Sequence, residues 1–201
     1  KSKGIRKLDY LVLTHGDYDH LGEAINILEK FRVDQIYINE GHINYYERAI
    51  IKKYNTNILK EKMIINLGNF SFQSLNKDLN EENDSSIILY GVYNAYQMLF
   101  MGDASTKSER ELLKNYNLSK INFLKVGHHG SKTSTSEELL KTIKPDIALI
   151  SAGVDNKFHH PHLVIIDRLL HYHIKYYLTI KVGSVEIYFS KNKYRIVSCI
   201  S

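Results

Sequence analysis

Short apolar runs alternate along the chain with segments in which apolar residues recur every three or four positions. Such runs predict buried strands, and the wider spacing predicts amphipathic helices. Strands are expected at residues 8–13, 33–38, 70–75, 86–90, 96–101, 121–126 and 146–152, and three short ones close the chain. Helices are expected at about residues 20–28, 43–54, 106–116, 134–144 and 161–172, with a polar loop at 76–85. This alternation indicates an α/β architecture.

Local signals mark several of the expected helix starts. Thr106 with Glu109, and Ser134 with Glu137, fit the capping-box pattern, in which side chains satisfy the first free N–H groups of a helix. Pro161 suits the first turn of the last long helix, because its fixed backbone angle matches that position. No repeat or linker interrupts the pattern, so the chain is expected to fold as one unit.

The segment after the first predicted strand carries four possible metal ligands within six positions. His15, Asp17 and Asp19 alternate, so they point the same way in an extended chain. His20 follows where the chain turns into a helix. Imidazole and carboxylate groups mixed this closely suit one divalent cation, or two. The competing interpretation is a solvated polar loop between a strand and a helix.

Later turns repeat this arrangement of a strand followed by polar residues. Asp103 comes after Gly102 at the end of the fifth predicted strand and suits a bridging ligand. His128 and His129 follow the sixth predicted strand. Because adjacent strand residues point to opposite sides, we expect only one of them to bind a metal, and the other to orient it or to meet substrate.

Two further segments are candidates for the same site. Asn156 to His162 lies between the seventh predicted strand and a helix start, which favours anions, so a histidine there could grip a phosphate or protonate a leaving group. Asp84 lies just before a strand and could complete the coordination of one metal, although an ordinary turn explains it equally well. Because the ligand-rich turns follow strands, they are expected to gather at one edge of a sheet.

Composition narrows the chemistry. Residues 1–201 are 43% hydrophobic and 24% charged, which suits a single globular domain. The lone Cys199 excludes an internal disulfide and zinc held by a cysteine cluster. The net charge of +5 and the pI of about 9.0 are compatible with a polyanionic partner, although an AT-rich genome alone produces a similar lysine excess. No run approaches the ~18 apolar residues of a membrane span, and no signal peptide is expected.

Together these motifs resemble the metallo-β-lactamase superfamily. Residues 14–20 read Thr-His-Gly-Asp-Tyr-Asp-His, similar to that superfamily's His-x-His-x-Asp-His motif with Asp17 in place of the second histidine. With Asp103 and the stretches 125–134 and 156–162, the chain over about residues 8–190 most resembles the carboxyl-terminal domain of the ComEC family of competence DNA-uptake proteins.

The resemblance implies an αββα sandwich that holds two divalent ions at one sheet edge. The ions are expected to be zinc or manganese, because a carboxylate at position 17 hardens the first site and makes manganese competitive with zinc. The ligands that the resemblance implies are His15, Asp17 and Asp84 for one ion, Asp19, His20 and one of His128 and His129 for the other, Asp103 as the bridge, and His160 on the substrate side.

Only about seven residues precede the first predicted strand, whereas family members have several strands there. The sandwich is therefore expected to be truncated at its N-terminus, and an uncovered sheet edge invites self-association. The family's membrane-spanning segments are also absent. We expect a soluble domain, linked to a bacterial membrane only through a parent or partner protein, at the outer face of the cytoplasmic membrane.

The leading hypothesis is metal-dependent hydrolysis of a phosphodiester, with DNA as the expected substrate during competence and a water activated by two divalent ions. Two alternatives stay open: a hydrolase of small esters or phosphorylcholine-type diesters, and an inactive module that binds DNA or a protein partner. The residues expected to act are His160, His128 and Lys132 in catalysis, and Ser131, Ser134 and Asn156 in substrate binding.

Overall fold

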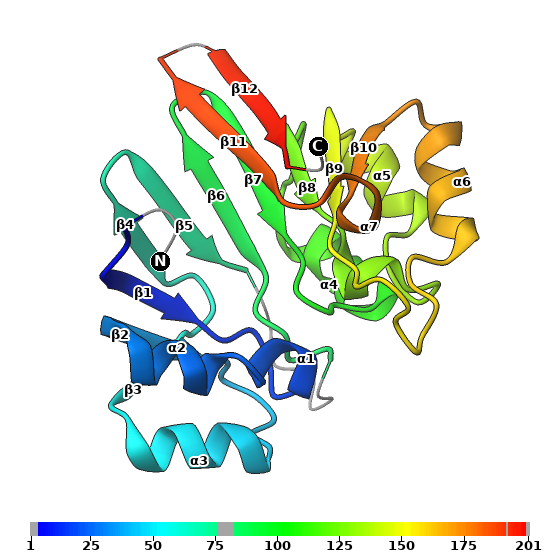
Figure 1. Ribbon diagram of the computed structural model, residues 1–201. Helices are drawn as coiled ribbons and strands as arrows, with labels where there is room; N and C mark the ends of the chain where they lie inside the picture. The colour runs from blue at the N-terminus through cyan, green and yellow to red at the C-terminus, as the bar shows by residue number, and fades with distance from the viewer. Residues whose placement is uncertain (1–3, 76–82, 192, 200–201) are drawn as a thin grey trace.

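The computed structural model describes residues 4–75, 83–191 and 193–199. These residues form sheets of three, seven and two strands, flanked by helices (Figure 1). Residues 76–82 of the expected polar loop lie outside the described residues. The alternation of strands and helices expected from the sequence is confirmed.

The three-stranded sheet, called the small sheet below, is formed by the N-terminal part of the chain. Its strands pair in the order β1-β2-β3 and run parallel. The single helix expected after the first strand is divided in two by a turn around Gly22. The elements are β1 (Lys7–Val12), α1 (Tyr18–Leu21), α2 (Ala24–Lys30), β2 (Arg32–Ile38), α3 (Tyr45–Lys53) and β3 (Thr56–Ile58).

The seven-stranded sheet has the order β10-β9-β8-β7-β6-β5-β4. Neighbouring strands from β4 to β7 are antiparallel, and those from β7 to β10 are parallel. The strands are β4 (Ile64–Leu67), β5 (Phe70–Ser74), β6 (Leu89–Tyr93), β7 (Tyr96–Phe100), β8 (Phe123–Lys125), β9 (Ile147–Ile150) and β10 (Lys175–Leu178).

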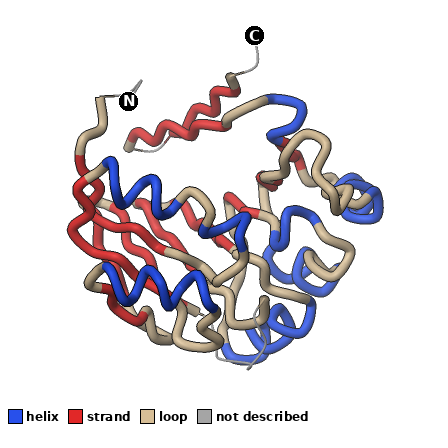
Figure 2. Tube along the Cα trace, turned by 60° about the horizontal axis from the view of Figure 1, so that its bottom comes forward, coloured by secondary structure: helices blue, strands red, loops and turns tan. Residues whose placement is uncertain are grey.

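Three helices cover one face of this sheet: α4 (Thr106–Asn115), α5 (Glu137–Ile143) and α6 (Leu163–His171) (Figure 1 and Figure 2). Leu99 and Leu124 from the strands pack with Leu140 of α5 in the largest apolar cluster, and all three are almost fully buried. The helices are therefore fixed to the sheet by burial of apolar area, at about 1.5–3 kcal/mol for each large side chain.

The other face of the seven-stranded sheet, called the large sheet, packs against the three-stranded sheet. Alternation along β1 sends Tyr10 and Val12 into a cluster with Ile65 and Phe72 of the large sheet, while Leu11 belongs to the cluster under α2 and α3. The layers are therefore helix, sheet, sheet and helix. This is the αββα sandwich expected from the resemblance.

The chain closes with α7 (Thr179–Val182) and a hairpin of β11 (Val185–Ser190) and β12 (Lys193–Ser198). Phe189 of the hairpin packs edge-on against Phe123 of β8, with ring centroids 5.6 Å apart. The hairpin thus lies on the same face of the large sheet as the small sheet, as Figure 1 shows. Among the described helices, none has both the length and the apolar character needed to cross a membrane.

Two expected helix caps and one helix start are wrong. Ser105 caps α4, and Ser136 caps α5, each through its side-chain oxygen. Glu109 does not close a box on its own helix, because its carboxylate accepts from the backbone N–H groups of the loop just before α5. Pro161 precedes α6, which begins at Leu163, because the intervening backbone N–H bonds to the loop after β8.

Candidate metal centre

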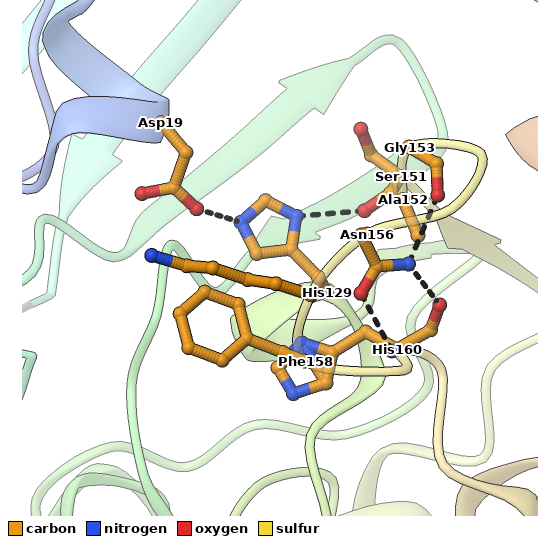
Figure 3. Close-up of a pocket in the computed structure, with 9 residues that line it drawn as sticks. Asp19, His129, Ser151, Ala152, Gly153, Asn156, Phe158 and His160 are labelled. Atoms are coloured by element: carbon orange, nitrogen blue, oxygen red, sulfur yellow. Dashed lines mark hydrogen bonds and ion pairs between the residues drawn. The ribbon is translucent and has the colours of Figure 1, made fainter.

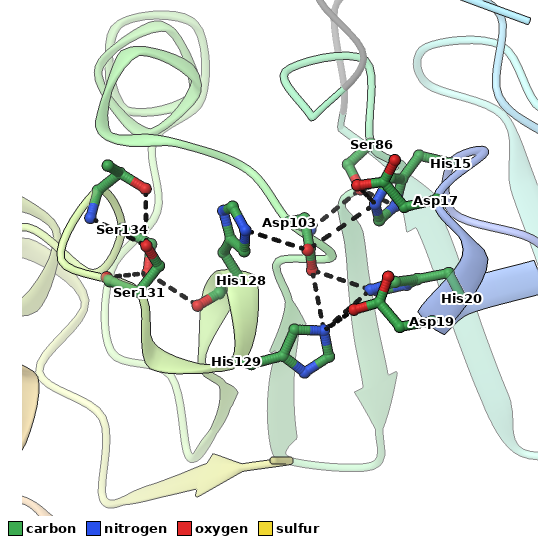
Figure 4. Close-up of polar contacts among 12 residues, drawn as sticks. His15, Asp17, Asp19, His20, Ser86, Asp103, His128, His129, Ser131 and Ser134 are labelled. Atoms are coloured by element: carbon green, nitrogen blue, oxygen red, sulfur yellow. Dashed lines mark hydrogen bonds and ion pairs between the residues drawn. The ribbon is translucent and has the colours of Figure 1, made fainter. Parts of the chain in front are cut away.

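The polar turns at the ends of β1 and β8 converge on Asp103, which follows β7 (Figure 4). Its Oδ1 lies 3.2 Å from His20 Nε2 and 3.8 Å from His129 Nε2. Its Oδ2 lies 3.8 Å from His15 Nε2 and 3.7 Å from His128 Nε2. Each oxygen of this buried carboxylate therefore faces its own pair of imidazoles, which is the arrangement of a bridging ligand.

Two more carboxylates lie near these imidazoles, one on each side of Asp103. Asp17 Oδ2 lies 3.5 Å from His15 Nε2, on the Oδ2 side of Asp103. Asp19 Oδ2 lies 3.3 Å from His129 Nε2, on the Oδ1 side. Donor atoms close enough to share an ion occur in two sets: His15, His20 and Asp103, and Asp19, His20 and His129.

Contacts of the Nδ1 atoms orient three of the imidazoles. His129 Nδ1 donates to the carbonyl of Ser151 at 2.7 Å, and His20 Nδ1 lies 3.0 Å from the hydroxyl of Thr14. His15 Nδ1 lies near the same hydroxyl, at 3.1 Å. When Nδ1 carries the proton, Nε2 presents its lone pair to the centre, which is how histidine ligands are usually held.

The residues present fit a divalent cation. His20 Nε2 and His129 Nε2 approach to 3.1 Å, so when both rings are neutral and carry their proton on Nδ1, two lone pairs face each other. Asp103 Oδ1 is buried and accepts no hydrogen bond from the residues that the structure describes. Facing lone pairs and an unbonded buried carboxylate oxygen are unfavourable without positive charge between them.

Charge and burial act in opposite directions on the carboxylates. Burial alone would raise the pKa of Asp103, but the close contact and the charge of His20, together with the neighbouring imidazoles, hold it well below its usual range. Burial raises the pKa of Asp17, and the nearby carboxylates raise it further. Crowded anions of this kind are stabilised by a cation.

The expectation that His128 and His129 point to opposite sides is wrong. They lie in a short 3₁₀ turn, η1 (Gly127–Gly130), with φ of 46° and 53° rather than extended angles. The alternation of a strand therefore does not apply, and both rings reach Asp103. His129 belongs to a set of metal donors, whereas His128 faces the other carboxylate oxygen.

Asp84 is not brought into either donor set. Its Oδ1 accepts from the Ser108 hydroxyl at 2.6 Å and from the Ser105 backbone N–H at 3.3 Å, so it is aimed at the start of α4. Ser86, two residues further along and given no role by the sequence, contacts two residues of the centre instead. Ser86 Oγ is 3.0 Å from His15 Nδ1 and accepts from the Asp103 backbone N–H at 3.0 Å.

The serines after η1 do not face the centre, so their predicted role in binding substrate is not supported. The buried Ser134 hydroxyl donates to backbone carbonyls of the same loop, 2.8 and 3.0 Å away. Ser131 is also buried, and its hydroxyl lies 3.0 Å from that of Thr133. Lys132 is exposed, and its backbone N–H donates to His162 Nδ1. These contacts shape the loop that carries the two histidines.

A cavity of about 500 Å³ opens beside the centre and is lined by His160, Asn156, Phe158 and Asp19 among others (Figure 3). Asn156 holds the backbone of His160 on both sides, accepting from its N–H and donating to its carbonyl, each at 2.8 Å. Asn156 therefore positions this loop. Burial and the neighbouring imidazoles lower the pKa of His160, which keeps its ring neutral near pH 7.

The sequence also did not predict the close packing of Asn44 against Gly16. A Cβ on Gly16 would lie 2.2 Å from Asn44 Nδ2, and that amide donates to the Gly16 carbonyl at 2.6 Å. Asn44 in turn caps α3 through a capping box with Glu47. The glycine between the first two donors was the available signal, because it marks a place where another side chain approaches the backbone closely.

The layered fold and this donor cluster define a class of protein. The family model of the metallo-beta-lactamase superfamily matches residues 1–154, and the chain belongs to that superfamily.

Within it, the chain is similar to competence proteins. It is 31% identical to ComE operon protein 3 of Bacillus subtilis (strain 168), across 96% of this chain and 26% of that protein. It is 34% identical to Recombination protein 2 of Haemophilus influenzae, across 94% of this chain and 23% of that protein. The chain thus spans about a quarter of the length of these relatives.

Solved structures support the fold. CmlA, a diiron β-hydroxylase from Streptomyces venezuelae, matches with a TM-score of 0.60 at 12% identity, over 87% of this chain and 44% of that one. The metallo-beta-lactamase fold protein YhfI from Bacillus subtilis matches with a TM-score of 0.54 at 11% identity, over 85% and 74%. The fold and the resemblance expected from the sequence are both confirmed.

Proposed function

We propose that this chain is a metal-dependent phosphodiesterase that cuts DNA during competence DNA uptake. The observation that carries the proposal is the Asp103 carboxylate, whose two oxygens each face two imidazoles at 3.2–3.8 Å. Such a double-sided centre suits a pair of divalent ions. At that position the ions would supply an activated water and offset the charge that develops on the phosphoryl oxygens.

The residues divide between the two ion positions. On the Oδ2 side of Asp103, His15 and Asp17 are the proposed ligands, with His128 next to them. On the Oδ1 side, His20, Asp19 and His129 are the proposed ligands. Manganese and zinc are both candidates, because the set mixes imidazole with several carboxylates. CmlA is a diiron enzyme, and its similar fold supports a proposal of two ions rather than one.

Residues of the cavity would hold the substrate. His160 lines it beside the centre, and Asn156 fixes its backbone, so a neutral imidazole is available to hydrogen-bond a phosphoryl or leaving-group oxygen. Among the described residues that line the cavity, Lys157 is the one lysine or arginine, so it is the cation proposed for a flanking phosphate. Lys132 is not among the residues that line it. We therefore assign the phosphate contact to Lys157 and leave Lys132 as a peripheral candidate.

The identity of the substrate rests on the relatives and on charge. The names of the similar proteins link them to competence and recombination. The net charge of +5 favours a polyanion. Because the chain spans about a quarter of these relatives, we propose that it works as a domain of, or together with, a membrane protein of DNA uptake.

The test uses the chain stripped of metal and then supplied with Mn²⁺ or Zn²⁺, with fluorescent oligonucleotides and small esters as substrates. We expect oligonucleotide cleavage to return with metal, to fall steeply with salt, and to be lost in Asp19→Ala. Asp167→Ala, an exposed aspartate on α6, is the matched control. Full cleavage under chelation would contradict the proposal. Fast turnover of small esters without salt dependence favours the small-ester alternative, and less than about one ion per chain favours a binding module.

A further inference from the structure

Two exposed aromatic rings flank the centre. Tyr18, which lies between Asp17 and Asp19 in the sequence, is 70% exposed, and Phe158 is 55% exposed. Both line a second cavity, of about 340 Å³, that also contains Asp103 and Lys157. It shares Asp19, His129 and His160 with the cavity of about 500 Å³. Large aromatic rings left in contact with water at the mouth of a polar site point to a ligand with a flat apolar face.

Each ring contacts a neighbouring aromatic side chain. Phe158 stacks on His160, with centroids 5.7 Å apart and planes 23° apart, and Lys157 Nζ lies 4.6 Å from its centroid. Phe158, His129 and Asp19 line the same cavity (Figure 3). On the other wall, Tyr18 leans on Tyr46 with centroids 6.0 Å apart. Each ring is held on its support while most of its surface stays open.

We propose that Tyr18 and Phe158 are stacking surfaces for the two nucleobases on either side of the scissile phosphodiester, and that Lys157 binds the adjacent phosphate. This inference rests on the proposed function and narrows its substrate to a strand with unpaired bases. A cavity of this volume suits a nucleotide-sized group. In a duplex the base faces are covered by neighbouring pairs, whereas an unpaired strand offers them to aromatic side chains.

The test measures binding without cleavage. The metal-free chain in EDTA is titrated into fluorescein-labelled octathymidylate, an abasic octamer with the same phosphates, and a hairpin duplex. We expect the thymidylate to bind at least about tenfold more tightly than the abasic strand, since base–aromatic stacking has about that effect for each base. Phe158→Ala and Tyr18→Ala should each remove much of this ratio, and the double variant should remove nearly all of it.

Controls separate stacking from general damage. Phe158→Tyr keeps a ring and should keep the ratio, whereas Phe158→Leu keeps apolar area and should lose it. Tyr188→Ala, an exposed tyrosine on β11, should bind like the unsubstituted chain. Equal affinity for thymidylate and abasic strands, or unchanged ratios in both alanine variants, would overturn the inference. Duplex binding as tight as thymidylate binding would do the same.

The two proposals fail in different ways. If the metal-loaded chain cuts oligonucleotides but Phe158→Ala leaves KM and the binding ratio unchanged, the stacking inference fails and the phosphodiesterase stands. If no metal restores cleavage but the binding ratio is present and ring-dependent, the phosphodiesterase fails and a base-stacking site remains. With both intact, Phe158→Ala should raise KM for octathymidylate about tenfold and change kcat much less.

Discussion

Substituting Ser86 by alanine tests whether the centre depends on a residue that touches no substrate. Ser86 is fully buried, and its hydroxyl stands between His15 Nδ1 and the Asp103 backbone N–H, 3.0 Å from each. Gly102 permits this approach, because a Cβ there would lie 2.5 Å from Ser86 Oγ. The alanine variant removes the acceptor of a buried N–H and a partner that orients an imidazole.

The expected magnitudes follow from these two losses. An unsatisfied buried N–H costs about 1–3 kcal/mol of folding free energy, which for a chain of this size lowers the Tm by about 2–4 °C per kcal/mol. Loss of an orienting contact behind a ligand histidine lowers metal affinity about 10–100-fold. Stability and metal affinity should therefore both fall in Ser86→Ala.

The assays are thermal unfolding of the metal-free chain and competition with a chromophoric chelator for Zn²⁺ or Mn²⁺. Ser108→Ala is the matched control, because this buried serine hydroxyl bonds to a carboxylate, Asp84, outside the donor sets. It should lose stability without losing metal affinity. Equal metal affinity in Ser86→Ala and Ser108→Ala would refute the reasoning and reduce Ser86 to a packing residue.

Three other outcomes are expected. Gly16→Ala should destabilise the fold by about 1–3 kcal/mol by overpacking against Asn44, measured by urea unfolding. Burial raises the pKa of Glu109 above 4.5. The contribution of Glu109 to stability is therefore greatest below pH 4.5 and declines as the pH rises through the raised pKa. The difference in free energy of unfolding between the unsubstituted chain and Glu109→Gln should shrink from pH 4 to 7. Saturating metal at a thousand times its Kd should stabilise the chain by about 4 kcal/mol, and Asp103→Asn should abolish that rise in Tm.

The sequence was sufficient for the layers and for most of the candidate donors that the structure brings together. Apolar runs and spaced apolar positions predicted the strands and helices, and His15, Asp19 and His20 were recognisable as candidate donors because they follow the first strand. The rule of alternation failed at His128 and His129, because left-handed backbone angles in η1 turn both rings to the same carboxylate. That conformation depends on contacts with other loops, which a local pattern does not encode.

Side chains whose partners come from distant segments were the least predictable. Glu109 fits a local capping box, yet its carboxylate bonds to the loop before α5. Asp84 has the chemistry of a ligand, yet α4 supplies a hydroxyl and a backbone N–H that capture it. In both cases an acceptor had two possible partners, and contacts with a segment distant in the sequence decided which one it met.

The donors come from both layers of the sandwich. His15 and Asp17 follow a strand of the small sheet, whereas Asp103 and His129 follow strands of the large one, and a hydrogen bond from the Ile87 N–H to the Thr14 carbonyl joins the two sides. Binding of a cation by donors from both layers would therefore be thermodynamically linked to docking of the layers. A ligand or partner that pulled the small sheet away would separate these donors, and under the proposed function it would abolish metal binding and activity together.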